Sequence, residues 1–324
     1  MKNVIIGIDV SKLTLDISVL IDSTFQFFTI ENTVKALKKF FKEFKEHQVM
    51  IAMENTGRYN YHLYEVLPLF EFKVYVINPL HIKRSIGLVR GKNDKIDSKR
   101  IALFLEKHHI DLRIWSPCSK TLQKIKLLNT ERRLRVKIRA ALLTQLADQS
   151  LLKGMQDKDL LKLNKDFIAL LDKQISFIED KILYLIENDE VLKDQYHRIQ
   201  TIPGVGKVLA ANMLIKTNGF TEIQSAREMS CYAGVAPFEY QSGTSLKYKS
   251  KVSPLADKEL KKILHLAAMS AIRFKNDLAV YYLRKVSEGK NKMSVLNAVR
   301  NKIIHRIYSL IKNKTFYQNQ LEMS

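Results

Sequence analysis

Cysteine is scarce in this chain, and long apolar runs are missing from it. The only cysteines are Cys118 and Cys231, which lie far apart and outside any CxxC pair or histidine cluster. This scarcity argues against a disulfide framework or a zinc site and is typical of a reducing cytosol. No uncharged apolar run reaches the roughly 18 residues of a transmembrane helix, and the first residues lack the apolar core of a signal peptide. We therefore expect a cytoplasmic protein that is neither exported nor membrane-spanning.

Acidic residues are also in short supply relative to basic ones. Lys and Arg number 54 against 33 Asp and Glu, which gives a formal net charge of +21. The excess is concentrated in residues 241–314, where 17 basic against 4 acidic residues leave a net charge of +13. Such an excess in an ordered chain predicts a polyanionic partner, and nucleic acid is the first candidate.

The first part of the chain alternates runs rich in β-branched and aromatic residues with stretches of helical spacing. Strands are expected at 4–10, 13–20, 25–30, 49–54 and 72–77, with helices at 33–46 and 58–69. This order, β-β-β-α-β-α-β followed by a helix, predicts an α/β domain of the ribonuclease H-like type. The pattern breaks at residues 114–120, so we assign this domain to residues 1–118.

A helical region follows, which we assign to residues 119–195. Within it one apolar stripe has the alternating three- and four-residue steps of a coiled coil: Leu161, Ile168, Leu171, Ile175, Ile178, Ile182 and Leu185. Its neighbour could be the helix predicted at 122–146 or a second protomer, and so narrow a stripe does not distinguish them.

The remainder, residues 196–324, is predicted to be a mainly helical, DNA-handling domain. Two glycine-containing segments come first, then a polar loop around QSGTSLKYKSKVS, then amphipathic helices to about Asn313. The tail after Lys314 is expected to be frayed. Tyr281, Tyr282 and Tyr308 have the helical spacing of core residues, which disfavours a tyrosine recombinase.

Four acidic residues are candidates for a metal site. Asp9 and Glu54 end two apolar strands that lie side by side in a ribonuclease H-like sheet, and Asp94 and Asp97 share one face at a predicted helix start. Each acid alone has an ordinary explanation as a turn residue, a strand-end charge or a helix-capping acid. Together, in this element order, they favour two Mg²⁺ ions roughly 3.5 to 4 Å apart, the arrangement that cleaves or transfers phosphodiester strands.

Two segments of the C-terminal part could contact nucleic acid. IPGVGKVLAA resembles the hairpin of a helix-hairpin-helix motif, in which Gly204, Gly206 and Lys207 would approach a phosphate, although Pro-Gly turns before helices are common. The polar loop carries Ser242 and Ser245 within a cationic stretch that would attract phosphate: Lys247, Lys249 and Lys251. By their residue types alone, serines in such a loop are turn residues more often than nucleophiles.

Several of these motifs together are similar to those of a known family. GIDVSK, AMENTGRY and KNDKIDSKRIA resemble the DEDD transposases of the insertion sequence one-ten family and the related Piv/MooV-type DNA invertases. IPGVGKVLAANML, SCYAGVAPFEYQSGTS and KVSPLADKELKKILHLAA resemble the C-terminal transposase domain of that family. The resemblance covers nearly the whole chain. The segment from Leu246 to Glu259 departs from it, with acidic Asp257 and Glu259 where more Gly and Arg are expected.

The resemblance implies more than the residues do. It implies a RuvC-like N-terminal domain, a coiled-coil region, and a homo-oligomer, a dimer or tetramer, acting on donor and target DNA. It further implies that Ser242, with Ser245 as the weaker alternative, joins the carboxylates of another protomer and forms a covalent link to DNA. In members of the family that use a structured bridge RNA, the RNA pairs with both DNAs. A bacterial or archaeal protein that associates with the nucleoid when active would fit.

Three alternatives remain open. A structure-selective nuclease such as a Holliday-junction resolvase would use the same four acids but would not need the long second half. An actin-like ATPase has a similar first hairpin, but this sequence lacks a later glycine-rich adenosine loop. A noncatalytic nucleic-acid-binding protein would keep its activity after Asp9→Asn.

Overall fold

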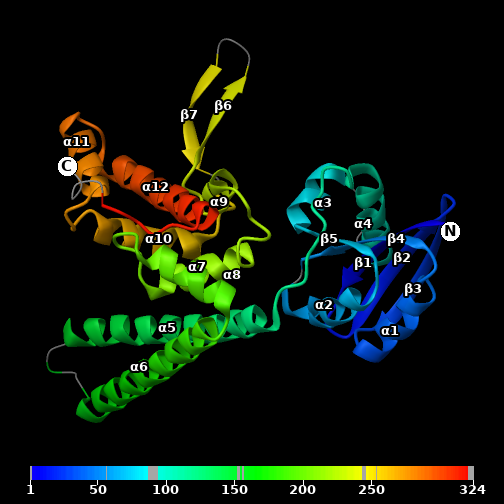
Figure 1. The fold of residues 1–324 in the computed structure, drawn as a ribbon. Coiled ribbons are helices and arrows are strands. Elements are labelled where there is room, and N and C mark those ends of the chain that lie inside the picture. The colour runs from blue at the N-terminus through cyan, green and yellow to red at the C-terminus, as the bar shows by residue number, and fades with distance from the viewer. Residues whose placement is uncertain are drawn as a thin grey trace. The chain divides into compact units, whose positions relative to one another are not determined.

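The chain divides into an α/β unit and a mainly helical unit. The computed structural model describes residues 2–55, 57–86, 94–151, 154, 157–242, 246–252 and 254–319. It separates into two compact units, Met1–Pro117 and Cys118–Ser324, which are described one at a time (Figure 1). The predicted combination of an α/β N-terminal part with a helical remainder is confirmed.

The first unit is built on a five-stranded sheet of order β3-β2-β1-β4-β5. β1 runs antiparallel to β2 and parallel to β4, and β4 runs parallel to β5. The predicted adjacency of the first and fourth strands is therefore confirmed. The strands are β1 (Asn3–Val10), β2 (Thr14–Ile21), β3 (Thr24–Glu31), β4 (Gln48–Glu54) and β5 (Lys73–Ile77).

Helices cover both faces of this sheet (Figure 1). On one face, Val4, Ile6 and Ile8 of β1 pack with residues of α1 and α2. On the other, Ile5 of β1 and Ala52 of β4 pack with residues of α4. This alternation is the two-residue period of a strand that is buried on both sides. The helices are α1 (Val34–Lys42), η1 (Gly57–Asn60), α2 (Tyr61–Val66), η2 (Leu67–Leu69), α3 (Pro79–Ile86) and α4 (Asp94–His108).

The second unit is helical apart from one β-hairpin. One apolar core joins residues of α5, α6, α8, α10 and α12, so the long helices and the C-terminal helices share it. The elements are α5 (Lys120–Leu151), α6 (Lys158–Glu187), α7 (Glu190–Gln200), α8 (Lys207–Thr217), α9 (Ala226–Tyr232), β6 (Pro237–Ser242), β7 (Leu246–Val252), α10 (Lys258–Ala271), α11 (Asp277–Ser287) and α12 (Lys292–Asn313). Within the described ranges, no helix is long and apolar enough to cross a bilayer.

The apolar stripe of α6 packs against α5 of the same chain. Leu171, Ile178 and Ile182 of the stripe are buried. Polar pairs run along the contact, with Arg132 Nε to Glu179 Oε1 at 2.6 Å and Arg135 Nε to Gln174 Oε1 at 2.9 Å. The coiled-coil spacing is thus satisfied by an intramolecular partner.

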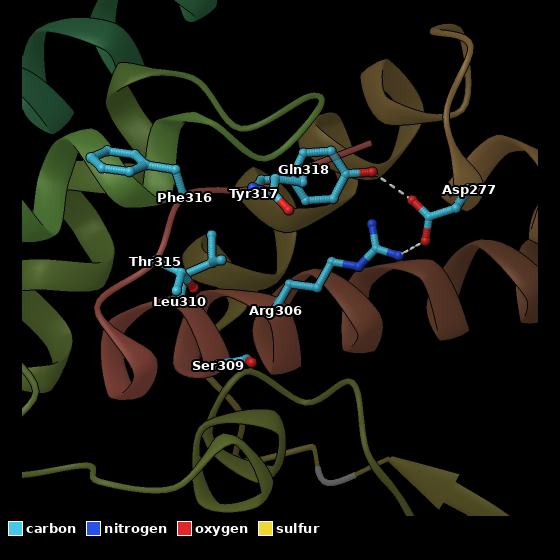
Figure 2. Close-up of a pocket in the computed structure, with 8 residues that line it drawn as sticks. All are labelled: Asp277, Arg306, Ser309, Leu310, Thr315, Phe316, Tyr317 and Gln318. Carbon is cyan, nitrogen blue, oxygen red and sulfur yellow. Dashed lines mark hydrogen bonds and ion pairs between the residues drawn. The ribbon is translucent and has the colours of Figure 1, made fainter. Parts of the chain in front are cut away.

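Two local expectations for the second unit were wrong. The described residues of the segment expected to be a polar loop belong to the paired strands β6 and β7, in which Pro237 pairs with Val252 and Ser242 with Leu246. The tail after Lys314 is held through residue 319 rather than frayed. Tyr317 donates its phenol hydrogen to Asp277 Oδ1 at 2.6 Å, and Arg306 forms an ion pair with the same carboxylate (Figure 2). Asn319 donates to the Lys275 carbonyl oxygen at 3.0 Å.

Candidate functional site

Three of the four predicted acids meet at one point of the first unit. Asp9, Asp94 and Asp97 each offer a carboxylate oxygen, and these oxygens all lie within 4.8 Å of one another. Asp9 comes from β1, and the other two come from the first turn of α4. Three converging carboxylates form the hard-oxygen donor set that Mg²⁺ and similar cations require.

Gly7 lets α4 lie directly on β1 and so brings these acids together. A Cβ atom at residue 7 would overlap the Ser98 carbonyl oxygen and the Ala102 nitrogen of α4. Ser18 of β2 donates its hydroxyl hydrogen to the same Ser98 oxygen at 2.8 Å. Because Asp9 faces the same side of the sheet as Gly7, the start of α4 brings its two acids over Asp9.

The negative charges of the cluster repel one another. Burial raises the pKa of Asp9, and the charges of Asp94 and Asp97 raise it further, while a hydrogen bond from the Val10 N–H partly offsets them. Arg100 donates to Asp97 Oδ1 at 2.7 Å, so Asp97 has a cationic partner. A divalent cation would relieve the remaining repulsion, and the residues present therefore fit such an ion.

Glu54 stands beside this cluster without being part of it. In the sheet register Ile8 pairs with Met53, so Asp9 and Glu54 are at the same level on neighbouring strands. Within the described residues, the acids that meet at 4.8 Å are the three named above, and Glu54 is outside that group. Its main-chain oxygen accepts a hydrogen bond from the Asn60 amide at 2.7 Å.

The serine predicted to act as nucleophile lies at the end of β6. The main chain of Ser242 pairs with Leu246, the first residue of β7. Its side chain lies outside the described residues, as does all of Ser245. Three predicted phosphate-binding residues lie on β7, and their side chains are also outside the described part: Lys247, Lys249 and Lys251.

The two glycines of the predicted phosphate hairpin have different surroundings. Gly204 has a φ of +81°, and a Cβ there would overlap the Ala267 oxygen and the Ala271 nitrogen of α10. The fold therefore requires glycine at this position whether or not a phosphate binds there. Gly206 is the N-cap of α8, has no side-chain cap, and borders open space. Lys207 follows as an exposed residue at the first helical position.

Comparison with known proteins identifies the family. Residues 6–155 match a transposase model of the DEDD group from IS110 elements, and residues 196–283 match the model described as "Transposase IS116/IS110/IS902 family". The chain is an IS110-family DEDD transposase. The transposase is 26% identical to the pilin gene-inverting protein of Moraxella bovis over 326 residues, 98% of each chain, and the Moraxella lacunata protein is equally similar.

A shorter match points to the same family. The transposase is 26% identical over 123 residues to an insertion element IS110 protein of 43.6 kDa from Streptomyces coelicolor, covering 38% of this chain and 30% of that protein. The chain is thus an enzyme, a DNA transposase or recombinase, as the sequence motifs predicted.

Two buried asparagines of the transposase escaped the sequence-based search. Asn32, 6% exposed, donates from its amide to the main-chain oxygens of Ser11 and Tyr59, both at 3.0 Å. Ser11 follows the strand of Asp9, and Tyr59 follows the strand of Glu54. Asn32 therefore ties together the loops after the two acid-bearing strands, with Asn60 beside it. No local sequence pattern reveals such a tether, because its partners are main-chain atoms distant in sequence.

The candidate tyrosines of the transposase pack as core residues. Tyr308 is 9% exposed, donates to the Ile223 oxygen at 2.8 Å and contacts the Phe220 ring edge to face. Tyr281 and Tyr282 pack against the same core. The structural interpretation of these residues is confirmed.

Proposed function

We propose that this transposase cleaves and rejoins strands of donor and target DNA at a divalent-metal site held by Asp9, Glu54, Asp94 and Asp97. The convergence of Asp9, Asp94 and Asp97 carries the proposal. We propose Mg²⁺ because every ligand is a carboxylate oxygen, and two ions because such a pair cleaves and transfers phosphodiester strands. The five-stranded order, with acids ending two adjacent parallel strands, supports a RuvC-like domain.

The protein's contribution to this chemistry is to position charge. When bound, a pair of such ions activates the attacking oxygen and stabilises the leaving oxygen of a phosphodiester. Asp9 and Glu54 hold their carboxylates on a rigid sheet, and α4 presents the other two acids from its first turn. Without a cation, burial and the charges of Asp94 and Asp97 disfavour the ionised form of Asp9, which is why its pKa is raised.

We propose Ser242 as the nucleophile, with Ser245 as the second candidate. The serine oxygen would form an ester bond to phosphorus as the bond to the leaving strand breaks, and the leaving hydroxyl would take up a proton. A hydroxyl of another strand would then displace the serine. The family resemblance supports this role, and the place of Ser242 at the end of β6 is compatible with it.

Nucleic acid would be held by the second unit. Gly206 and Lys207 at the start of α8, beside Gly204, would meet a phosphate as in a helix-hairpin-helix motif. The cationic strand β7 would add contacts through Lys247, Lys249 and Lys251, and the charge of +21 suits both DNA and a structured guide RNA. We propose that such a bridge RNA helps to select the donor and target DNA.

A second copy of the chain is expected to pack on the α5–α6 pair. Large apolar side chains remain exposed there, including Leu134 (53%), Leu163 (66%) and Phe177 (66%), after the two helices have packed together. An exposed apolar set of this kind is typical of an interface between protomers. The proposed enzyme is therefore a homo-oligomer.

The experiment is recombination between donor and target plasmids in cells that carry the whole element. Asp9→Asn and Ser242→Ala are both expected to abolish recombination, while the wild type recombines. The matched control is Asp16→Asn, because Asp16 faces Asp9 in the β1–β2 register but instead accepts a hydrogen bond from Thr29 at 2.7 Å. It should retain recombination.

Other outcomes separate the alternatives. If Asp9→Asn is inactive and Ser242→Ala is active, the enzyme is a metal-dependent nuclease or strand-transferase without a serine intermediate. If Asp9→Asn remains active while binding DNA normally, the acids are structural and the metal proposal fails.

A further inference from the structure

A cavity of about 510 Å³ in the second unit lies between the glycine hairpin before α8 and the turn that joins α10 to α11. Residues 200–206 line it together with Ser270, Phe274 and Lys275. No acidic residue is among the described residues that line it. The cavity therefore combines an aromatic residue, a cationic residue and the residues of the glycine hairpin.

Phe274 is exposed on a hydrogen-bonded turn. Its side chain is 56% exposed, whereas Asn276 two residues later is 1% exposed. The Asn276 amide donates to the main-chain oxygens of Ala271 at 2.8 Å and Phe274 at 3.0 Å, and its Oδ1 accepts from the first N–H groups of α11. These hydrogen bonds hold the main chain of the turn, so the Cα atom of Phe274 is held in place while its side chain stays exposed.

Cationic side chains flank this ring in sequence. Arg273 and Lys275 are both exposed, and in the described part of the chain neither has an ion-pair partner. A single exposed aromatic residue is ordinary on a protein surface. Phe274 is an exposed ring between two cations, and it lines a cavity whose described lining residues include no acid. Proteins use this chemistry to stack an unpaired base beside its phosphates.

We propose that this cavity binds an unpaired nucleotide, with its base stacked on Phe274 and its adjoining phosphates near Arg273 and Lys275. The inference rests on the proposed function, because it assumes that the second unit handles nucleic acid. A base in a duplex has both faces covered by its neighbours, so the cavity selects single strands. An unpaired DNA strand and an unpaired segment of RNA offer the same chemistry.

The test uses the scarcity of tryptophan in this chain. Trp115 is the only tryptophan and lies in the first unit, so Trp115→Phe with Phe274→Trp leaves one reporter at the cavity. The matched control carries Leu283→Trp instead, because Leu283 is 66% exposed on α11 and does not line the cavity. Each full-length protein is titrated with a single-stranded DNA, the same sequence as RNA, and the DNA duplex.

Stacking predicts that a single strand quenches the fluorescence of the Phe274→Trp protein, that the duplex does not, and that the control changes little. Quenching by DNA alone assigns an unpaired DNA strand, and quenching by RNA alone assigns an RNA segment. Equal quenching by the duplex, equal quenching of the control, or no quenching by either single strand overturns the proposal.

Affinity supplies a second measurement that is independent of the reporter. Phe274→Ala and Phe274→Leu should each weaken binding of the preferred single strand about tenfold, since a stacked base is lost, while duplex binding stays the same. Undiminished binding of the single strand by both variants contradicts the proposal. The Asp9→Asn protein should bind the single strand as tightly as the wild type, because Asp9 lies in the first unit. If Asp9→Asn still recombines DNA, the metal proposal fails, and the base-stacking proposal is tested separately by the binding data.

Discussion

Two half-buried aspartates, one in each unit, have opposite electrostatic surroundings. Burial raises the pKa of Asp9, and Asp94 and Asp97 raise it further. Burial acts on Asp257 too, but the Leu260 N–H and the Lys216 ammonium outweigh it, so the pKa of Asp257 is lowered. Asp257 is satisfied by its own fold, whereas Asp9 is placed among like charges. The two carboxylates are buried to a similar extent, but the neighbours of Asp257 stabilise its charge and those of Asp9 destabilise it. This difference distinguishes a structural acid from a candidate cation ligand.

The largest expected effect is on activity. Asp9→Asn should lower recombination by more than about a thousandfold, because metal-held charge stabilisation is worth several kcal/mol. Asp257→Asn should leave the chemical step intact at temperatures where the variant is folded. Recombination assays at low temperature check both. If Asp9→Asn and Asp257→Asn are both folded and lose recombination activity equally, the two acids do not differ in role.

Stability should respond in the opposite way. Asp257→Ala removes the cap of α10, which accepts from Leu260 N at 2.9 Å, and leaves Lys216 without its partner at 2.6 Å. We expect a loss of about 3 kcal/mol in the free energy of unfolding. Urea denaturation measures it. Glu131→Ala is the matched control, since its ion pair with Arg135 is more exposed and should be worth less than about 0.5 kcal/mol.

Gly7→Ala should damage the acidic cluster without removing an acid. The added methyl group would push α4 away from β1 at Ser98 and Ala102. We expect a loss of about 2 kcal/mol in unfolding free energy, together with weaker divalent-metal binding. Denaturation and metal titration on one preparation check this. Full metal affinity in the Gly7→Ala protein would show that the position of α4 does not control the site.

The smallest effects are in the pH dependence of stability without metal. The folded pKa of Asp9 is above its unfolded value, so its charge costs stability at neutral pH, and that cost is relieved as pH falls through the raised pKa. The folded pKa of Asp257 is below its unfolded value, so its contribution is present above about pH 4 and lost as pH falls further.

Difference curves isolate the two groups. The unfolding free energy of the wild type minus that of Asp9→Asn should rise as pH falls, and the corresponding difference for Asp257→Asn should fall. Parallel curves would contradict the assigned pKa directions. A divalent cation should raise the Asp9 difference at neutral pH, where the carboxylate is charged and binds the ion, and should leave the Asp257 difference unchanged.

Most of the first unit could be predicted because its signals are local. Strand alternation located β1 and β4, and the acids at their ends marked the sheet edge. The approach of α4 at Gly7 was not predictable from local patterns, because its reason is a main-chain contact with residues far along the chain. The Asn32 tether was missed for the same cause.

The second unit was harder to predict for two reasons. The partner of the α6 stripe depends on long-range pairs such as Arg132 with Glu179, which helical periodicity cannot assign. Strands β6 and β7 contain many polar residues, so their sequences were predicted to be a loop. The docked tail at Tyr317 depends on Asp277, which is distant in sequence.

The central claim is that Asp9, Asp94 and Asp97 form a cation site, and manganese binding to the purified protein tests it most directly. Electron paramagnetic resonance would count the Mn²⁺ ions bound by the wild type, Asp9→Asn and Asp16→Asn. We expect saturable binding by the wild type and by Asp16→Asn, and loss of that binding in Asp9→Asn. Equal binding by all three proteins, or none by the wild type, would contradict the claim.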